Sequence, residues 1–137
     1  MAFANAEELY KVMRLTLDKI QKDEKLVTSL GSSNMVTCLK VPSLDATITL
    51  VNKGSVMAIY GPPPADLKID ATTTNNDDIF IKFWQGKLNL MMAMTKGQVK
   101  SQGSVTAMLK LLPKITPVYK LFAESLREAG REDLVIK

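Results

Sequence analysis

The chain has 137 residues, of which 46% are hydrophobic and 23% charged, and it contains one cysteine and no histidine. This length and composition predict one folded globular domain spanning residues 1–137. The absence of histidine excludes catalytic triads with an imidazole base and metal sites built from several imidazoles. A lone cysteine cannot form an intrachain disulfide, which favours a reducing compartment. The composition therefore favours a binding protein over an enzyme.

The charge balance is mildly basic, with 18 Lys and Arg residues against 14 Asp and Glu residues and a net charge of +4. The lysines are interleaved with acidic residues, which favours a solvated surface over a polyanion-binding face and predicts no nucleic-acid partner. Transient contact with an anionic membrane surface stays open, because summed basic charge acts at a distance. Neither a secretory signal nor a stretch of about 18 apolar residues occurs, so we expect a cytoplasmic protein.

The first half of the chain predicts one helix followed by strands. Asn5, with Glu8 three residues later, forms a capping pattern, and apolar residues then recur at helical spacing as far as Ile20. From residue 34 the period changes to two, which predicts strands over 35–41, 46–50, 55–60 and 67–72. Short connections, including the hairpin signal at residues 52–54, predict an antiparallel meander of these strands.

Two short apolar helices are predicted in the middle of the chain. Asn75 or Asn76 can cap the first of them, which Gly86 ends. Asn89 can cap the second, which ends at Gly97.

The last third of the chain predicts a strand over 99–103 and two helices. Ser104 begins the first helix, which Pro113 limits, and a second helix restarts with Pro117 in its first turn and ends at Gly130. The elements together predict an α+β fold, in which helices cover one face of a five-stranded, mainly antiparallel sheet.

The sequence offers no group of residues suited to catalysis or metal binding. It contains no phosphate-binding glycine loop, no nucleophile elbow and no Cys-x-x-Cys pair. Asp77 and Asp78 are adjacent, so their carboxylates diverge on a helix, and we interpret both as first-turn residues that favour the helix dipole. Cys38 lies on an alternating strand and is interpreted as a buried or half-buried structural thiol. We expect no catalytic residue, no metal and no cofactor.

The most concentrated feature is apolar. Phe80, Phe83 and Trp84 occur at helical spacing, and three methionines follow between residues 91 and 94. Methionine is flexible and lines surfaces that accept differently shaped apolar ligands, although it also fills gaps in ordinary cores. The two short helices are therefore either part of the core or a lid over a cavity.

Residues 67–112 carry a pattern of fixed spacings that includes a DLKIDATTT strand (66–74), an Asp-x-x-Phe (77–80), a Gly-Lys-Leu-Asn (86–89) and a Val-Lys (99–100). Ala93-Met94, Gly97, Gly103, Met108 and Lys110-Leu111 complete it. This pattern resembles the sterol carrier protein 2 family of non-specific lipid-transfer proteins. The sequence departs from the family at Leu90, where proline is frequent, at Met94-Thr95 and at Ser104.

The resemblance implies that the five-stranded sheet and its helices enclose an apolar tunnel. It also implies that the protein carries a fatty acid, fatty acyl-CoA, sterol or phospholipid between membranes without covalent chemistry, as a monomer or homodimer. The residues expected in the lipid cavity or its lid are Phe80, Phe83, Trp84, Leu88, Met91, Met92, Met94, Met108, Leu111 and Leu112. The alternative is a non-catalytic interaction or dimerisation module of the same fold, in which the lid packs against a partner.

Overall fold

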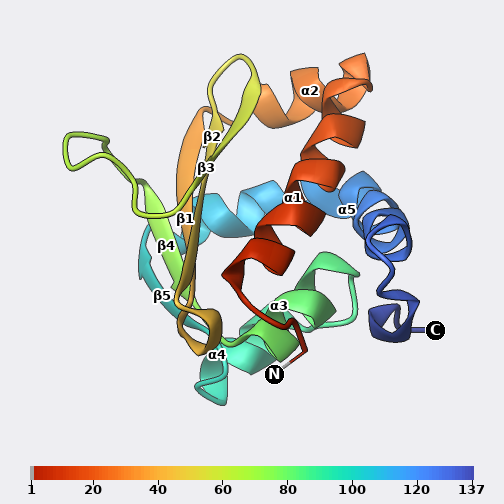
Figure 1. Cartoon of the computed structure of the whole chain (residues 1–137). Coiled ribbons are helices and arrows are strands. Elements are labelled where there is room, and N and C mark those ends of the chain that lie inside the picture. The colour runs from red at the N-terminus through yellow and green to blue at the C-terminus, as the bar shows by residue number, and fades with distance from the viewer. Residues whose placement is uncertain (1) are drawn as a thin grey trace.

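The structure is a computed structural model that describes residues 2–137. Its helices lie on one face of a single sheet, which confirms the predicted α+β class (Figure 1). The strands are β1 (Met35–Val41), β2 (Ala46–Asn52), β3 (Val56–Tyr60), β4 (Ala71–Thr74) and β5 (Lys100–Gly103). The helices are α1 (Ala6–Gln21), α2 (Glu24–Gly31), α3 (Asp77–Trp84), α4 (Leu90–Thr95) and α5 (Val105–Glu128), with 3-10 turns η1 (Pro42–Leu44) and η2 (Glu132–Leu134).

The sheet has the strand order β3-β2-β1-β4-β5, with β1 in the centre. Its pairings are antiparallel except for that of β1 with β4, which is parallel. The mainly antiparallel sheet is thus confirmed, but the prediction of a simple meander is wrong at its fourth strand. That strand begins at Ala71 instead of residue 67, and it lies beside β1 instead of β3.

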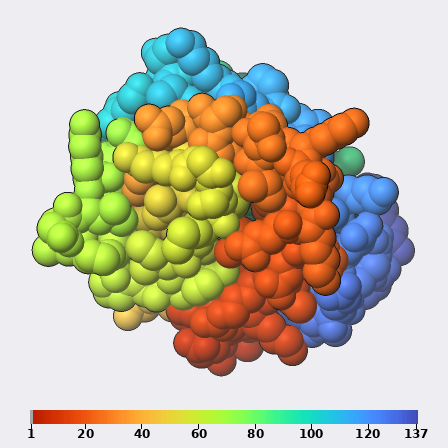
Figure 2. All heavy atoms as spheres, turned by 90° about the horizontal axis from the view of Figure 1, so that it is seen from above, coloured from red at the N-terminus to blue at the C-terminus, as the bar shows by residue number. Residues whose placement is uncertain are grey.

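The segment between β3 and β4 explains this correction. Its three prolines lack the N–H donor that a sheet ladder needs, so the chain leaves the sheet after Tyr60. It then runs over the face opposite the helices and projects from the body (Figures 1 and 2). The chain rejoins the sheet at Asp70, whose amide donates to the Val36 carbonyl at 2.9 Å and whose carboxylate accepts from the Val36 amide at 2.8 Å.

The N-terminal helical region contains two helices where one was predicted. Asn5 caps α1 as expected, because its side chain accepts a hydrogen bond from the Glu8 amide. The additional helix α2 begins after Asp23, whose side chain accepts from the Leu26 amide. In the space-filling view from above, α2 lies beside the β2–β3 hairpin (Figure 2), where the Gly54 amide donates to the Gly31 carbonyl at 3.0 Å.

The C-terminal helix α5 is continuous over 24 residues, so the predicted break between Pro113 and Pro117 is wrong. Each proline removes one intrahelical hydrogen bond and costs about 3 kcal/mol in a helix interior. Burial of the apolar stripe on both sides of the prolines offsets this cost, because Met108, Ile115 and Phe122 are all buried. The short helices α3 and α4 have the predicted positions, and Gly86 follows α3 with a φ of +71°.

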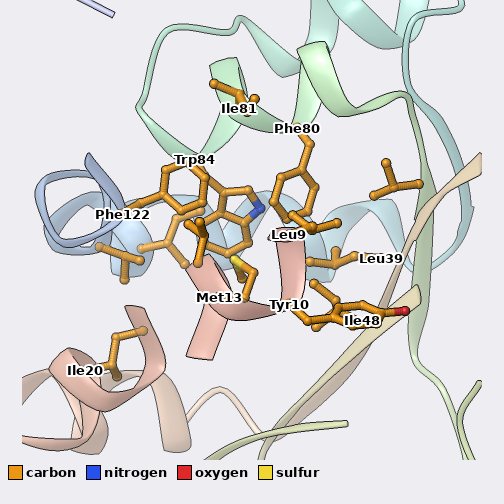
Figure 3. Packing of buried hydrophobic residues seen from close by; sticks show 14 of the residues in the cluster. Leu9, Tyr10, Met13, Ile20, Leu39, Ile48, Phe80, Ile81, Trp84 and Phe122 are labelled. Carbon is orange, nitrogen blue, oxygen red and sulfur yellow. The ribbon is translucent and has the colours of Figure 1, made fainter. Parts of the chain in front are cut away.

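The main core lies between the sheet and the layer formed by α1, α3 and α5. Figure 3 shows Phe80 and Trp84 of α3 pointing toward Leu9 and Met13 of α1. The rings of Phe80 and Phe122 meet edge to face with centroids 6.3 Å apart, which joins α3 to α5. Helix α3 is therefore held from both sides, and its aromatic residues face the interior.

Candidate apolar cavity

The interior between the sheet and the helices contains a cavity of about 100 Å³. Its walls are almost wholly apolar and come from every layer of the fold. The wall from the helices and from the connection between α3 and α4 is formed by Met13, Thr16, Leu17, Ile20, Leu30, Phe80, Phe83, Trp84, Leu88, Leu90, Met108, Leu111, Leu112, Ile115 and Val118. The wall from the sheet and its flanking residues is formed by Thr37, Leu39, Leu50, Asn52, Val56, Ala58, Tyr60, Thr73, Asn75 and Val99.

Most of the residues predicted from the sequence lie around this cavity. Those that line it are Phe80, Phe83, Trp84, Leu88, Met108, Leu111 and Leu112. The three clustered methionines of α4 do not line it. Met91 and Met92 are exposed, whereas Met94 packs on a smaller cluster formed by Ile79, Ala93 and Val99. The role of each residue as a lipid contact stays a prediction.

The predicted list omitted the contributions of α1 and the sheet. Met13, Leu17 and Ile20 belong to the apolar stripe of the predicted N-terminal helix, and in the structure they pack in the core and also line the cavity. Because the cavity is continuous with the core, helical spacing alone does not distinguish a wall residue from a packing residue. For Leu39 and its neighbours, the sequence signal is the period-two alternation of the strands, which places these residues on the same face of the sheet.

The cavity contains a few polar atoms that sequence reasoning missed. Thr37 Oγ1, Asn52 Oδ1 and the Tyr60 hydroxyl are buried and have no hydrogen-bond partner in the described part of the chain. Burial raises the pKa of the Tyr60 phenol. The charge of nearby Arg14 lowers this pKa and that of Asp18 raises it, but burial has the largest effect, so the phenol is neutral at pH 7. None of the described residues that line the cavity carries a charge. Its polar atoms are therefore suited to neutral groups.

Asp77 lies in the first turn of α3, as predicted, and it also makes buried hydrogen bonds that were not predicted. The residue is 2% exposed, and its carboxylate accepts hydrogen bonds from the Ala2 amide at 2.7 Å, the Phe3 amide at 2.9 Å and the Ser43 hydroxyl at 3.0 Å. Burial by itself would raise the pKa of Asp77, but these hydrogen bonds outweigh burial and hold the pKa below its ordinary value. Asp77 thus joins the first turn of α3 to the N-terminal segment and to η1. These hydrogen bonds hold α3, which carries Phe80 and Trp84, in its position.

The single cysteine of the chain lies in the interior. Cys38 is 1% exposed, which confirms the interpretation as a buried thiol. Residues 2–137 contain no group of three or more His, Cys, Asp or Glu side chains placed to hold a metal ion. Across the same residues, none of the helices has both the length and the apolar character required to cross a membrane.

Comparisons with known sequences point to one family. The family model of the SCP-2 sterol transfer family matches residues 11–113. Sterol carrier protein 2 of Arabidopsis thaliana is 44% identical over 50 residues, which cover 36% of this chain and 41% of that protein. The aligned part is thus less than half of that relative's length.

Solved structures with the same fold include carriers and one enzyme. The sterol carrier protein domain 2 of Helicoverpa armigera has 23% identity and a TM-score of 0.62, covering 82% of this chain and 89% of that one. Sterol carrier protein 2 from Yarrowia lipolytica has 19% identity and a TM-score of 0.58, with coverage of 90% and 94%. The sec-alkylsulfatase Pisa1 from Pseudomonas sp. has 20% identity and a TM-score of 0.56, covering 66% of this chain and 14% of that one. At these identities the likeness concerns the fold alone.

Proposed function

Because the chain belongs to the SCP-2 sterol transfer family, we propose that residues 1–137 act as one domain that binds an apolar lipid and carries it between membranes without covalent chemistry. The binding site is the cavity between the sheet and the helices α1, α3 and α5. The ligand classes are a fatty acid, a fatty acyl-CoA, a sterol or a phospholipid.

The observation that carries this proposal is the composition of the cavity wall. Its side chains are apolar apart from a few neutral threonine, asparagine and tyrosine groups. Burying a hydrocarbon chain is favourable by about 0.8 kcal/mol per CH₂, so a chain of sixteen carbons gains on the order of 12 kcal/mol before the costs of association. Such a wall suits a long apolar chain, and the described residues that form it include no charged side chain that would pair with an ionised head group.

The size of the cavity indicates that its walls move when a lipid enters. Its volume of about 100 Å³ is well below the range of about 300–1,000 Å³ that is typical of ligand pockets. Leu88 and Leu90, which line the cavity, flank the start of the short helix α4. We assign this segment as the part of the wall that opens, because Ala93 is the one fully buried residue of α4, whereas Met91 and Met92 are exposed.

Lipid binding can be measured through Trp84, the single tryptophan of the chain. Its indole is 6% exposed and lines the cavity. Titration with palmitate, palmitoyl-CoA or cholesterol is expected to change its fluorescence saturably, because the ligand replaces contacts of the ring. Trp84→Phe serves as the optical control, since it must abolish the signal while calorimetry still detects binding.

Two results would contradict the proposal in different ways. If no ligand binds by either method, the carrier function is wrong. If the protein instead forms a stable homodimer that protects the surface of α4 and binds no lipid, the interaction-module alternative is favoured.

The exposed side of α4 is suited to contact with an anionic membrane. Met91 and Met92 are 53% and 54% exposed. The exposed lysines Lys87, Lys96 and Lys100 occur in the same segment of the chain. Apolar side chains flanked by basic ones bind membrane surfaces that contain anionic lipid. We therefore propose that α4 touches the membrane during loading and release.

Replacing Met91 and Met92 together by aspartate is expected to lower the rate of lipid transfer between phosphatidylserine-containing vesicles about tenfold. Ligand affinity in solution is expected to remain unchanged, because neither side chain lines the cavity. A fluorescent fatty acid in donor vesicles provides the assay. Met57→Asp is the matched control, since Met57 is 55% exposed on β3 and lies outside the proposed contact. Equal rates in the double variant and the wild type would contradict the membrane contact.

A further inference from the structure

Two polar side chains lie close together on the sheet wall of the cavity without a hydrogen-bond partner. Thr37 of β1 is 6% exposed and Asn52 of β2 is 4% exposed, and both line the cavity. Thr37 pairs with Leu50 in the sheet, and Asn52 lies two residues beyond Leu50 on the same face. The two side chains are therefore diagonal cross-strand neighbours. Thr37 Oγ1 and Asn52 Oδ1 are both without a partner in the described residues.

A buried polar atom without a hydrogen bond destabilises a folded protein, so this pair calls for a ligand group. The Asn52 oxygen needs a donor, and the Thr37 hydroxyl can donate or accept. An ionised carboxylate or phosphate has no proton to give, and no charged side chain among residues 2–137 lines the cavity to compensate it. A neutral hydroxyl supplies both the donor and the acceptor.

We propose that the Thr37–Asn52 pair receives the hydroxyl of an uncharged lipid alcohol, which enters the cavity with its hydroxyl end first. The ligand hydroxyl donates to Asn52 Oδ1 and accepts from Thr37 Oγ1. This assignment rests on the proposed function, because it places the ligand in the same cavity. It makes Thr37 and Asn52 residues that determine specificity among apolar ligands of similar length.

The test compares two ligands that differ in one hydrogen-bond donor: 1-tetradecanol and its methyl ether, 1-methoxytetradecane. The wild-type protein is expected to bind the alcohol about tenfold more tightly than the ether, because the ether leaves Asn52 Oδ1 unpaired. In Thr37→Val, Asn52→Leu and the double variant, affinity for the alcohol is expected to fall toward that of the ether. Affinity for the ether is expected to be unchanged or slightly higher.

Thr49→Val is the matched control. Thr49 is also a buried threonine whose hydroxyl has no partner in the described part of the chain, but it does not line the cavity. Its sheet partner is Cys38, so it lies on the opposite face from Thr37. Both Thr37→Val and Thr49→Val are expected to raise the thermal midpoint by roughly 3 °C, since each removes an unpaired hydroxyl. Only Thr37→Val is expected to lower affinity for the alcohol.

The outcomes separate this inference from the proposed function. Loss of discrimination in the Thr37 and Asn52 variants, with discrimination retained in Thr49→Val, supports it. If the wild type binds the alcohol and the ether equally, or if the double variant still prefers the alcohol, the inference is overturned while lipid binding stands. If the wild type binds neither of these ligands nor palmitate, the proposed function itself fails.

Discussion

Replacing Asp77 by asparagine is expected to lower the free energy of unfolding by about 3 kcal/mol, which is a large part of the stability of a domain of this size. The carboxylate accepts hydrogen bonds from two backbone amides and one hydroxyl. The Ala2 and Phe3 amides both donate to one carboxylate oxygen, and the Ser43 hydroxyl donates to the other. An asparagine can keep the two amides on its single oxygen, but only as neutral hydrogen bonds, and its NH₂ group replaces the oxygen that accepts from Ser43. The charge-assisted part of the three bonds is then lost, which is about half the strength of each. Urea denaturation followed by circular dichroism measures the change.

Asp78→Asn is the matched control for this prediction. Asp78 is exposed and lies in the same first turn of α3, so its loss removes little beyond the favourable interaction with the helix dipole. That interaction is worth about 0.3–1 kcal/mol. Similar losses in the two variants would show that the dipole explains both residues and that the buried hydrogen bonds of Asp77 add nothing.

Asp77 also gives the stability of the protein a dependence on pH. A carboxyl group whose pKa is lower in the folded than in the unfolded protein stabilises the fold when the pH is above its pKa in the unfolded protein. This stabilisation is lost as the pH falls through the pKa that the group has in the folded protein. The pKa of Asp77 is lowered in this way, so wild-type stability is expected to fall more steeply below roughly pH 4 than that of Asp77→Asn. Parallel pH profiles of the two proteins would contradict this expectation.

Replacing Leu111 by tryptophan is expected to lower the affinity for palmitate at least tenfold while the fold is retained. Leu111 is half-buried on α5 and lines the cavity, so a larger ring there occupies part of its volume of about 100 Å³. Because a half-buried side chain can partly turn outward, the cost in stability is expected to stay within about 1–3 kcal/mol. Calorimetric titration measures the affinity without interference from the added tryptophan.

Leu109→Trp is the control for this second prediction. Leu109 is half-buried on the same helix and does not line the cavity. Its replacement is expected to leave the affinity for palmitate unchanged. If Leu111→Trp also binds palmitate with wild-type affinity, the lipid lies elsewhere in the molecule.

The local elements of this fold could be predicted because their signals lie within a few residues. Asn5, Asn89 and Ser104 each cap the helix that follows them, as the sequence indicates. The position of β4 could not be predicted in the same way. It depends on the contact of Asp70 with Val36, two residues 34 positions apart, and no short-range pattern reports such a contact. The continuity of α5 through its prolines likewise depends on tertiary packing that outweighs local propensity.

The residues that line the cavity could be predicted only where they lie close together in the sequence. The aromatic residues of α3 lie close together in the sequence and share one helical face, so Phe80 and Trp84 were identified. Thr37 and Asn52 were not identified as cavity residues. Each occurs in a strand or turn pattern where a polar side chain is unremarkable. Only their burial, with no partner among the described residues, distinguishes them, and burial is a property of the packed structure.

The parallel pairing of β1 with β4 also bears on the order in which the chain folds. Strands β1, β2 and β3 are contiguous and antiparallel, so they can associate through short connections while the rest of the chain is still unfolded. The other edge of β1 pairs with β4 later, because this pairing brings together Thr37 and Ala71, which are 34 residues apart in the sequence. Until then the backbone of β1 is an open edge that another chain could pair with. Aggregation during synthesis is therefore expected to begin at β1.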